Sequence, residues 1–471
     1  MKHYIAIILF FIIGLGNLLA QTPTLLSLDY AQELASEHSY ALKLARLSEA
    51  ESQSTTKQTL AAGLPHISAT AEYNNFTEIP TQVAPADAFG FPNYLNEYLL
   101  NLGEATGVSL NAPPVDPNAI SELQFGSPHS ATVGFTATQL IFSGTYLVAI
   151  QAAKVFEDLN KNAIELTAID VVKSVGMAYH TALASKDNEN LLKNALSILE
   201  ATLVETKALS DAGFIESLDV DMLRLSVSTL KNEIENASLQ SQLTTSLLLF
   251  QIGLPVDTDV ILSDSFEGLV EKIQMINQDA SAQIDVNNHP QVMESQYMLE
   301  MAELNVKAKT ASSLPLISGF YSNSENAQRD EFNIFDSSEK WYPTQLWGLK
   351  VSMPVFGSFE GKHIRQKAQV QALKAETGLQ MTLQATQLEQ SAASAELRRS
   401  RDMVDEAINS LSLATKIFDN VKLGHSEGVK SSFELNQVHN QLLTNAGALV
   451  GARLRLLNAH SRFIAATTTN K

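Results

Sequence analysis

Two long stretches of the chain contain no proline, and this distribution limits the folds that are open to it. No proline lies between Pro128 and Pro255, and none follows Pro354. Because proline ends helices, its absence permits long ones. A glycine motif divides each stretch, as GFIESLDV from Gly213 and GVKSSFEL from Gly428. We therefore expect two hairpins, each made of a long helix, a glycine turn and a shorter helix.

The expected helices have nearly the same lengths in the two halves of the chain. Apolar residues recur along them at intervals of three and four, as in an amphipathic helix. At about 1.5 Å per residue the longer helices would measure about 100 Å and the shorter ones about 50 Å, so neighbouring helices must cover their apolar stripes in coiled-coil fashion. The expected ranges are 146–211, 217–251, 362–425 and 432–466. A further helix over 28–62 would stack end to end with the helix over 217–251.

Shorter repeated segments indicate that both halves follow one plan. GLPHISATAEY resembles SLPLISGFYSN, SEHSYAL resembles NNHPQVM, and VGFTATQLIFSG resembles WGLKVSMPVFGS. Each half is therefore predicted to contain a helix, a strand, a long loop, a strand, a long helix, a glycine turn and a helix. The long loops are expected over 75–129, which is rich in proline, and over 324–343. His38 and His289 occupy equivalent positions and are predicted to lie on helix surfaces.

Four short segments alternate between apolar and polar residues, as β-strands do. They lie at 67–74, 132–141, 316–323 and 347–353, and the third is the weakest match. Strands of about ten residues with one apolar and one polar face match those of outer-membrane barrels, although an ordinary antiparallel sheet packed on helices stays open as an alternative. Four strands cannot close a barrel, so three copies would have to pool twelve strands if these segments span a bilayer.

Composition and the amino-terminal residues indicate where the protein acts. The 471-residue chain has no cysteine and a net charge of −19, which argues against disulfides, thiolate metal sites and nucleic-acid partners. Residues 1–20 place Lys2 before an apolar run, which predicts a cleaved signal peptide and a mature chain from about Gln21, with a membrane anchor as the alternative. The expected destination is a Gram-negative periplasm or outer membrane, with secretion outside the cell as the lesser alternative.

No constellation of residues predicts an enzyme. GSFEGKH lacks the spacing of a phosphate-binding loop and is more typical of a strand-to-helix turn. The sequence contains no HExxH, GxSxG or EF-hand pattern, and its histidines are scattered. We therefore predict no catalytic residue, no metal site and no cofactor.

The ordered set of motifs over the whole mature chain resembles the TolC-like outer membrane efflux protein family. The resemblance rests on the repeated halves, the LPxIS strand starts, the QLIFSG and MPVFGS strand ends, the glycine motifs and LLLFQIGLP. It implies a mainly α fold with a small β part: a long α-helical coiled-coil barrel and four transmembrane β-strands per protomer, which form a 12-stranded β-barrel in a homotrimer. The implied divisions are a signal peptide at 1–20, a first structural repeat at 21–254, an equatorial connector at 255–281 and a second repeat at 282–471.

The resemblance also implies a function. Such a protein is the outer membrane channel of a tripartite efflux or type I secretion system, a passive exit duct across the periplasm. Its implied partners are two further copies of itself, outer membrane lipid, a periplasmic adaptor (membrane fusion) protein that opens the periplasmic tip, and an inner-membrane transporter that supplies energy. A periplasmic coiled-coil scaffold or binding protein without a pore is the alternative from another class.

By this resemblance the two glycine turns are the periplasmic tips of the hairpins. The implied adaptor-docking residues are Gly213, Ser217, Leu218, Gly428, Ser432 and Phe433. The two glycines permit the chain to reverse. Ser217 and Ser432 are expected to cap the returning helices, and Asp219 and Glu434 place a negative charge in their first turns. The motif could serve this structural purpose alone.

A gate is the further implication of the resemblance. The position of Glu434 lines the aperture in relatives, where threefold symmetry would bring three carboxylates together and favour cations. Asp219, Lys430 and His425 fall at positions that form closing contacts between neighbouring hairpins in relatives. Gln437 stands where known exporters carry a second acid, so no second acidic ring is expected.

Overall fold

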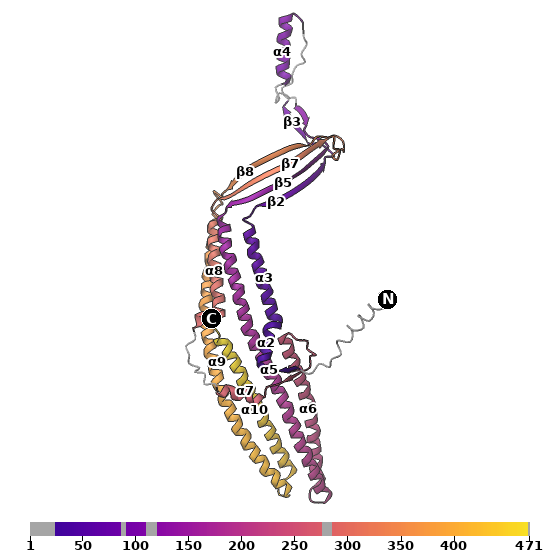
Figure 1. The fold of residues 1–471 in the computed structure, drawn as a ribbon, viewed down its shortest axis with the longest axis vertical. Helices are drawn as coiled ribbons and strands as arrows, with labels where there is room; N and C mark the ends of the chain where they lie inside the picture. The colour runs from indigo at the N-terminus through magenta and orange to yellow at the C-terminus, as the bar shows by residue number, and fades with distance from the viewer. Residues whose placement is uncertain (1–23, 86–90, 110–119, 276–284, 470–471) are drawn as a thin grey trace, which may run out of the picture. The chain divides into compact units, whose positions relative to one another are not determined.

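The computed structural model describes residues 24–85, 91–109, 120–275 and 285–469. They divide into two compact units, one of which contains the helical hairpins and the other a four-stranded sheet (Figure 1). The first unit comprises the described residues up to 57 and those of 151–307 and 362–471, and the second those of 58–150 and 308–361. The predicted signal peptide at 1–20 lies outside the described residues.

The long helices form where the proline-free stretches predict them. Their bounds are α5 Gly144–Asp211, α6 Ser217–Ile252, α9 Glu360–Ser426 and α10 Ser432–Thr467, and every end lies within two residues of its predicted position. A short turn that contains one of the two motif glycines joins α5 to α6, and another joins α9 to α10. None of the helices in the described part of the chain is both long and apolar enough to cross a bilayer.

The predicted single helix over 28–62 is wrong, because the chain breaks at Ser39. The observed helices are α2 Leu28–His38 and α3 Tyr40–Ala61. Ser39 between them has φ −57° and ψ 138°, which is not helical, and its Oγ accepts a hydrogen bond from Leu42 N at 3.3 Å. The serine side chain thus caps the new helix and replaces a backbone hydrogen bond that is lost at the break.

The equivalent break in the second repeat lies at His289. This residue follows the 3-10 helix η1 Val286–Asn288 and precedes α8 Pro290–Ala311. Its Nδ1 accepts a hydrogen bond from Gln291 N at 3.3 Å, and its side chain is buried. The prediction of a helix-surface histidine is therefore wrong for His289, whereas His38 is partly exposed.

The predicted connector contains regular structure that is tied to the long helix α5. Strand β6 Val260–Leu262 pairs in parallel with β1 Thr24–Leu26, and helix α7 Phe266–Met275 follows. The Tyr179 hydroxyl lies 2.9 Å from the Leu26 carbonyl oxygen and 2.8 Å from Asp264 Oδ2, and these two acceptors share its one proton. Burial, followed by the bond to Asp264, raises the pKa of the Tyr179 hydroxyl, so it stays protonated as a donor. The bond to Asp264 fixes the connector next to the apolar core, to which α2, α3, α5, α6, α7, α9 and α10 contribute.

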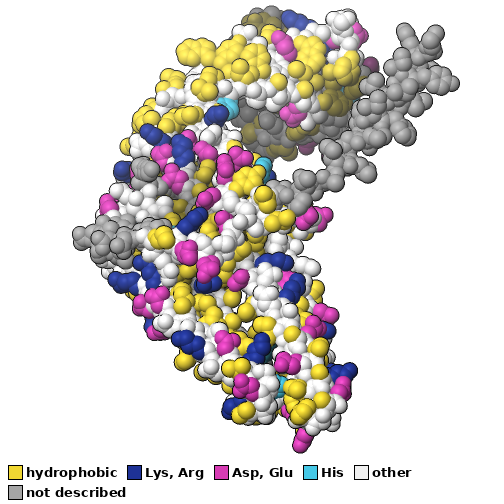
Figure 2. Space-filling view, turned by 60° about the horizontal axis from the view of Figure 1, so that its bottom comes forward, with side chains coloured by type: hydrophobic (Ala, Val, Ile, Leu, Met, Phe, Trp, Pro, Cys, Tyr) yellow, Lys and Arg dark blue, Asp and Glu magenta, His cyan; other side chains and the backbone are white. Residues whose placement is uncertain are grey.

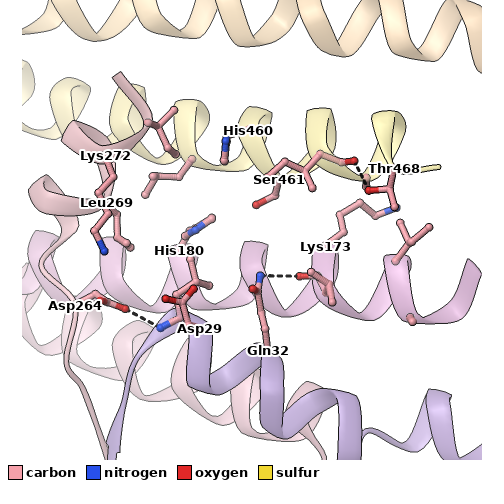
Figure 3. Close-up of a pocket in the computed structure, with 18 residues that line it drawn as sticks. Asp29, Gln32, Lys173, His180, Asp264, Leu269, Lys272, His460, Ser461 and Thr468 are labelled. Carbon is pink, nitrogen blue, oxygen red and sulfur yellow. Dashed lines mark hydrogen bonds between the residues drawn. The ribbon is translucent and has the colours of Figure 1, made fainter. Parts of the chain in front are cut away.

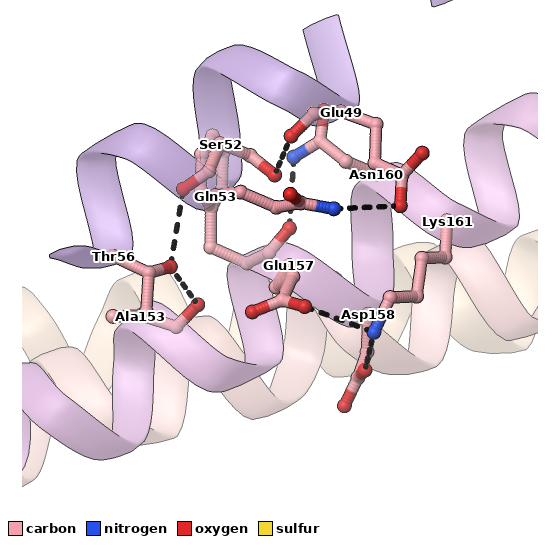
Figure 4. Close-up of polar contacts among 10 residues, drawn as sticks. Glu49, Ser52, Gln53, Thr56, Ala153, Glu157, Asp158, Asn160 and Lys161 are labelled. Carbon is pink, nitrogen blue, oxygen red and sulfur yellow. Dashed lines mark hydrogen bonds and ion pairs between the residues drawn. The ribbon is translucent and has the colours of Figure 1, made fainter. Parts of the chain in front are cut away.

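Helices α3 and α5 approach each other through small hydroxyl residues. The Thr56 hydroxyl lies 3.1 Å from the Ser52 carbonyl oxygen of its own helix and 3.3 Å from the Ala153 carbonyl oxygen of α5 (Figure 4). Ser52 is buried, whereas Leu44 and Leu47 of α3 are 65% and 66% exposed. Helix α3 therefore packs on α5 through small residues and leaves larger apolar residues uncovered in the single chain.

The sheet of the second unit is antiparallel, with strand order β2-β5-β7-β8 (Figure 1). The strands are β2 His66–Asn75, β5 His129–Phe142, β7 Leu316–Arg329 and β8 Tyr342–Ser352. The strand predicted with least support, β7, lies inside the sheet and pairs with β5 and β8. Pairing with these two strands therefore holds β7 in the sheet, although its own alternation of apolar and polar residues is weak.

The register of the strands gives the sheet one mainly apolar and one mainly polar face. A row on the apolar face contains Ile67, Ala137, Tyr321 and Trp347, and a row on the other face contains Thr70, Gly134, Ser324 and Thr344. On the polar face Thr132 Oγ1 donates to Asn326 Oδ1 at 3.0 Å. Thr70 is exposed and Leu349 is 67% exposed, so neither face forms a closed core in the single chain.

The prediction of one long loop over 75–129 is wrong, because this segment contains regular structure. Strand β3 Thr81–Pro85 pairs with β4 Ile120–Gln124, and helix α4 Phe91–Thr106 lies between them in sequence. The helix tolerates Pro92 because this residue sits in the first turn, where its missing amide hydrogen has no helical acceptor. In the second repeat, β7 and β8 extend into the predicted loop and shorten it to residues 330–341.

Gly253 provides a stability test of the packing between α6 and α2. It ends α6 with φ 89°, and a Cβ atom there would collide with the His38 carbonyl oxygen. We expect Gly253→Ala to lower the free energy of unfolding by about 2–4 kcal/mol, since both the left-handed backbone and the close approach exclude a side chain. Gly378→Ala is the control, because a Cβ atom at Gly378 meets open space. Thermal melts of the two variants in detergent would contradict this packing if their midpoints were equal.

Candidate functional site

The candidate site consists of the two turns that close the helical hairpins. Gly213 has φ 83° and Gly428 has φ 73°, a conformation that other residues rarely adopt. In the first turn Phe214 N donates to the Leu209 carbonyl oxygen at 2.9 Å. In the second, Val429 N donates to the Gly424 carbonyl oxygen at 2.8 Å. Both helices thus end in the same glycine-dependent Schellman motif.

The predicted helix caps at Ser217 and Ser432 are wrong by one residue. In the second turn Ser431 is the cap: its Oγ accepts from Glu434 N at 3.2 Å, while Glu434 Oε2 accepts from Ser431 N at 3.0 Å. In the first turn Glu216 is at the cap position and makes no side-chain hydrogen bond there. The spacing of a serine and a glutamate three residues later is the sequence signal for a capping box, and it could have identified Ser431.

The charged residues of the second turn pair within their own hairpin. Lys430 Nζ lies 2.6 Å from Glu434 Oε1, and this hydrogen bond, followed by the one from Ser431 N, lowers the pKa of the Glu434 carboxyl. Asp219 lies in the first turn of α6, as expected, and makes no ion pair with another residue that the structure describes. The positive charge of Lys430 therefore partly neutralises Glu434 in the single chain.

His425 lies inside its own hairpin in the single chain, and its contact with a neighbouring hairpin stays a prediction. Its Nε2 is 3.0 Å from Ser432 Oγ, and both side chains are only 2% exposed. Ser432 is covered in this way in the single chain, and its predicted role in docking a partner stays a prediction. The pair instead joins the end of α9 to the start of α10 and stiffens the second turn.

Large apolar side chains are exposed at both turns. Leu218 is 63% and Phe433 is 61% exposed, and these two were predicted as docking residues. Phe214 is 80% and Val429 is 76% exposed, and sequence reasoning missed them, although an apolar residue follows the glycine in both motifs. Figure 2 shows hydrophobic side chains among acidic and basic ones at its lower end, where these turns lie. Exposed apolar groups at equivalent positions are typical of a docking surface.

One polar contact links the two hairpins close to the turns. Asn436 Nδ2 of α10 donates to Ser226 Oγ of α6 at 2.9 Å. Further from the turns, Leu443 of α10 packs against an apolar cluster of α5 and α6 that contains Leu199 and Leu223. Neither Asn436 nor Ser226 has a predicted function, since no sequence motif marks a contact between residues 210 positions apart.

The first unit also contains a cavity of about 500 Å³ between α2, α5, α7 and α10 (Figure 3). Its polar lining includes Asp29, Gln32 and His180, and burial lowers the pKa of His180 to about 4, so this ring is neutral at physiological pH. His180 Nδ1 lies 3.3 Å from Asn458 Oδ1. In the part of the chain that the structure describes, no three His, Asp or Glu side chains gather as a metal site would require.

Comparison with known proteins gives a consistent result. Residues 283–468 match the family model described as outer membrane efflux protein. The probable efflux pump outer membrane protein TtgC of Pseudomonas putida is 24% identical over 356 residues, which cover 74% of this chain and 70% of TtgC.

Solved structures share the fold. The outer membrane protein VceC from Vibrio cholerae aligns with a TM-score of 0.66 at 15% identity, covering 94% of this chain and 96% of VceC. The CmeC outer membrane channel of Campylobacter jejuni aligns with a TM-score of 0.69 at 16% identity, covering 93% of this chain and 85% of CmeC. The fold class predicted from the sequence resemblance is thereby confirmed.

His439 of α10 provides a test of the buried polar groups near the second turn. Its ring is 5.6 Å from that of Phe418, both ring nitrogens are buried without a partner in the protein, and burial lowers its pKa. Because the unfolded chain takes up this proton first, the stability of the folded chain falls as pH drops below about 6.5. We expect His439→Phe to weaken this acid sensitivity and to stabilise the chain by about 1 kcal/mol.

The measurement is the melting temperature of both proteins between pH 7 and pH 5. His38→Phe is the control for replacing a partly exposed histidine by phenylalanine. A parallel loss of stability in His439→Phe and the original protein would show that His439 does not take up the proton.

Proposed function

We propose that this chain, a member of the outer membrane efflux protein family, is the outer membrane channel of a tripartite efflux or type I secretion system. The observation that carries the proposal is the amphipathic four-stranded sheet, whose edge strands β2 and β8 have no second partner strand among the described residues. In a bilayer such edges leave backbone groups unpaired at a cost of several kcal/mol each, so they must meet another copy.

Three copies of the sheet can close into a barrel without breaking its pairing pattern. The strands alternate in direction from β2 to β8, so β8 of one copy would run antiparallel to β2 of the next. Three times four strands give twelve, an even number, as an antiparallel ring requires. The apolar face with Trp347 and Leu349 would contact lipid, and the polar face with Thr70 and Thr132 would line the duct.

The hairpins would then continue the duct through the periplasm and end in the two turns. The exposed Phe214, Leu218, Val429 and Phe433 form a surface on which a periplasmic adaptor protein could bind. Asp219 and Glu434 would line the aperture, where their charges attract cations, although Lys430 weakens this effect for Glu434. An exposed pair between Lys430 and Asp219 of neighbouring hairpins, worth about 0.2–1 kcal/mol, could hold the aperture closed and yield to an adaptor.

A periplasmic coiled-coil scaffold without a pore is the alternative function. The sheet argues against it, because Ile67, Trp347, Leu349 and Val351 are each more than 60% exposed on one face. A protein surrounded by water rarely leaves so many neighbouring apolar residues uncovered.

Membrane fractionation distinguishes these two functions. We expect the full-length protein to remain in the outer membrane fraction after washing with high salt and to purify in detergent as a trimer. In planar bilayers the purified trimer should conduct ions, because its strands enclose a polar duct. A monomer released by the salt wash would favour the scaffold.

The proposed latch predicts a change in conductance. We expect the double substitution Asp219→Ala and Lys430→Ala to raise the open probability of the channel by about 1.4- to 5-fold per link, the factor that corresponds to about 0.2–1 kcal/mol. Lys231→Ala is the matched control, since it removes an exposed ion pair with Glu200 on the first hairpin. Equal open probabilities in the double variant and the original channel would exclude the latch.

A further inference from the structure

The cavity of the first unit is a feature that the proposed channel function does not use. Its volume of about 500 Å³ lies within the range of about 300–1,000 Å³ that small-molecule sites occupy. Helices α2, α5, α7 and α10 supply its walls, together with Asp264, which precedes α7 (Figure 3). The described residues that line it all belong to the first unit, so the cavity lies inside one compact part of the chain.

Most of the surface that the cavity offers to a ligand is apolar. Three helices supply large aliphatic side chains to it, namely Ile169 and Val172 of α5, Leu269 and Ile273 of α7, and Leu457 and Ile464 of α10. Burial of an apolar molecule against these side chains removes apolar surface from water on both sides. The walls therefore favour a ligand with an apolar body.

The charged residues of the lining favour a ligand without net charge. Two acids and two lysines are present, so the formal charges of the lining cancel; they are Asp29, Asp264, Lys173 and Lys272. Asp264 Oδ2 already accepts a hydrogen bond from Leu28 N at 2.7 Å. A charged ligand would lose its hydration here without gaining a net opposite charge, and this loss disfavours its binding.

One nitrogen atom of a buried side chain at the cavity has no partner. His180 of α5 is 2% exposed, and Figure 3 shows its ring between α5 and α10. Its Nδ1 lies 3.3 Å from Asn458 Oδ1, an acceptor, so in the neutral ring Nδ1 carries the proton and Nε2 has a lone pair. His180 Nε2 makes no hydrogen bond with a residue that the structure describes. A buried acceptor without a partner is costly, so the cavity suits a ligand that donates a hydrogen bond.

Water is the simplest partner for this nitrogen atom, but the cavity suits it poorly. A buried water molecule is held by about two to four hydrogen bonds, and mainly apolar walls offer few of them. An apolar molecule with one hydroxyl or N–H group would fill the cavity and pair the same nitrogen atom. Displacement of weakly held water by such a molecule favours binding.

We propose that this cavity binds a neutral, mainly apolar molecule whose hydroxyl or N–H group donates a hydrogen bond to His180 Nε2. Such a site is additional to the proposed channel function and depends on the first unit alone. A molecule bound there contacts α2, α5, α7 and α10 together, and it stabilises the folded chain because it binds the folded form.

Two photoreactive probes that differ by one hydroxyl group test the site. 4-Hydroxybenzophenone carries a hydrogen-bond donor and benzophenone does not, and both attach to nearby C–H bonds when irradiated. The full-length protein is labelled in detergent at about pH 6, where the phenol and the ring of His180 are neutral. We expect 4-hydroxybenzophenone to label peptides from 168–180 and 457–468 saturably. Benzophenone should label them about five times less, because it leaves His180 Nε2 unpaired.

The variant His180→Phe removes the acceptor and keeps an aromatic ring. In this variant the two probes should label the cavity equally, since neither can form the hydrogen bond. His439→Phe is the matched control, because His439 is also buried but does not line the cavity, and it should keep the fivefold difference. Each signal is divided by the labelling of β8, whose exposed apolar residues report how much of each probe the detergent holds.

The original protein alone can overturn the proposal, even if His180→Phe does not fold. Absence of label from both cavity peptides would exclude the site, and equal labelling by the two probes would exclude the hydrogen bond to His180. Neither result affects the channel proposal, which depends on the trimer and its conductance.

Discussion

The hydrogen-bonding groups at the two edges of the sheet impose the constraint on which the rest of the structure depends. Strands β2 and β8 each have one strand neighbour in the described chain, and the apolar face of the sheet is open. Hydrocarbon cannot satisfy the free backbone groups, so a sheet of this kind enters a membrane only as part of a closed ring. Helices α3 and α8 lead into this sheet and α5 and α9 lead away from it, so a ring of strands also brings the helices of several copies together.

The turns combine strong contacts within each hairpin with weak contacts between hairpins. Schellman bonds close both turns, and the second also has the capping box of Ser431 with Glu434 and the buried pair of His425 with Ser432. Among the described residues, one hydrogen bond joins the two hairpins of a chain near the turns, and it runs from Asn436 to Ser226. Near the turns, hydrogen bonds therefore order each turn more than they join the two hairpins, whereas further from the turns the hairpins share apolar clusters.

The sequence predicted the features that depend on local backbone chemistry. Proline-free stretches and two glycines located the long helices to within two residues, and alternation located three strands clearly. The predictions from the sequence were wrong where contacts with other parts of the chain determine the structure. Ser39 breaks the helix that was predicted over 28–62, and His289 is buried although it was predicted to lie on a helix surface. The cap of the second turn was misplaced because adjacent serines, Ser431 and Ser432, both suit the position, and the spacing to Glu434 that selects Ser431 was overlooked.

The duplicated plan has a consequence for symmetry. Each repeat supplies one pair of adjacent strands and one helical hairpin, and β5 pairs with β7 much as β8 of one copy would meet β2 of the next. In the proposed threefold ring the duplicated repeats would make six hairpins of two kinds. Covalent fusion of the repeats has let these two kinds diverge, as the capping box found only in the second turn of the described chain illustrates. Because the two kinds of hairpin differ at their turns, opening of the proposed aperture need not move both kinds alike.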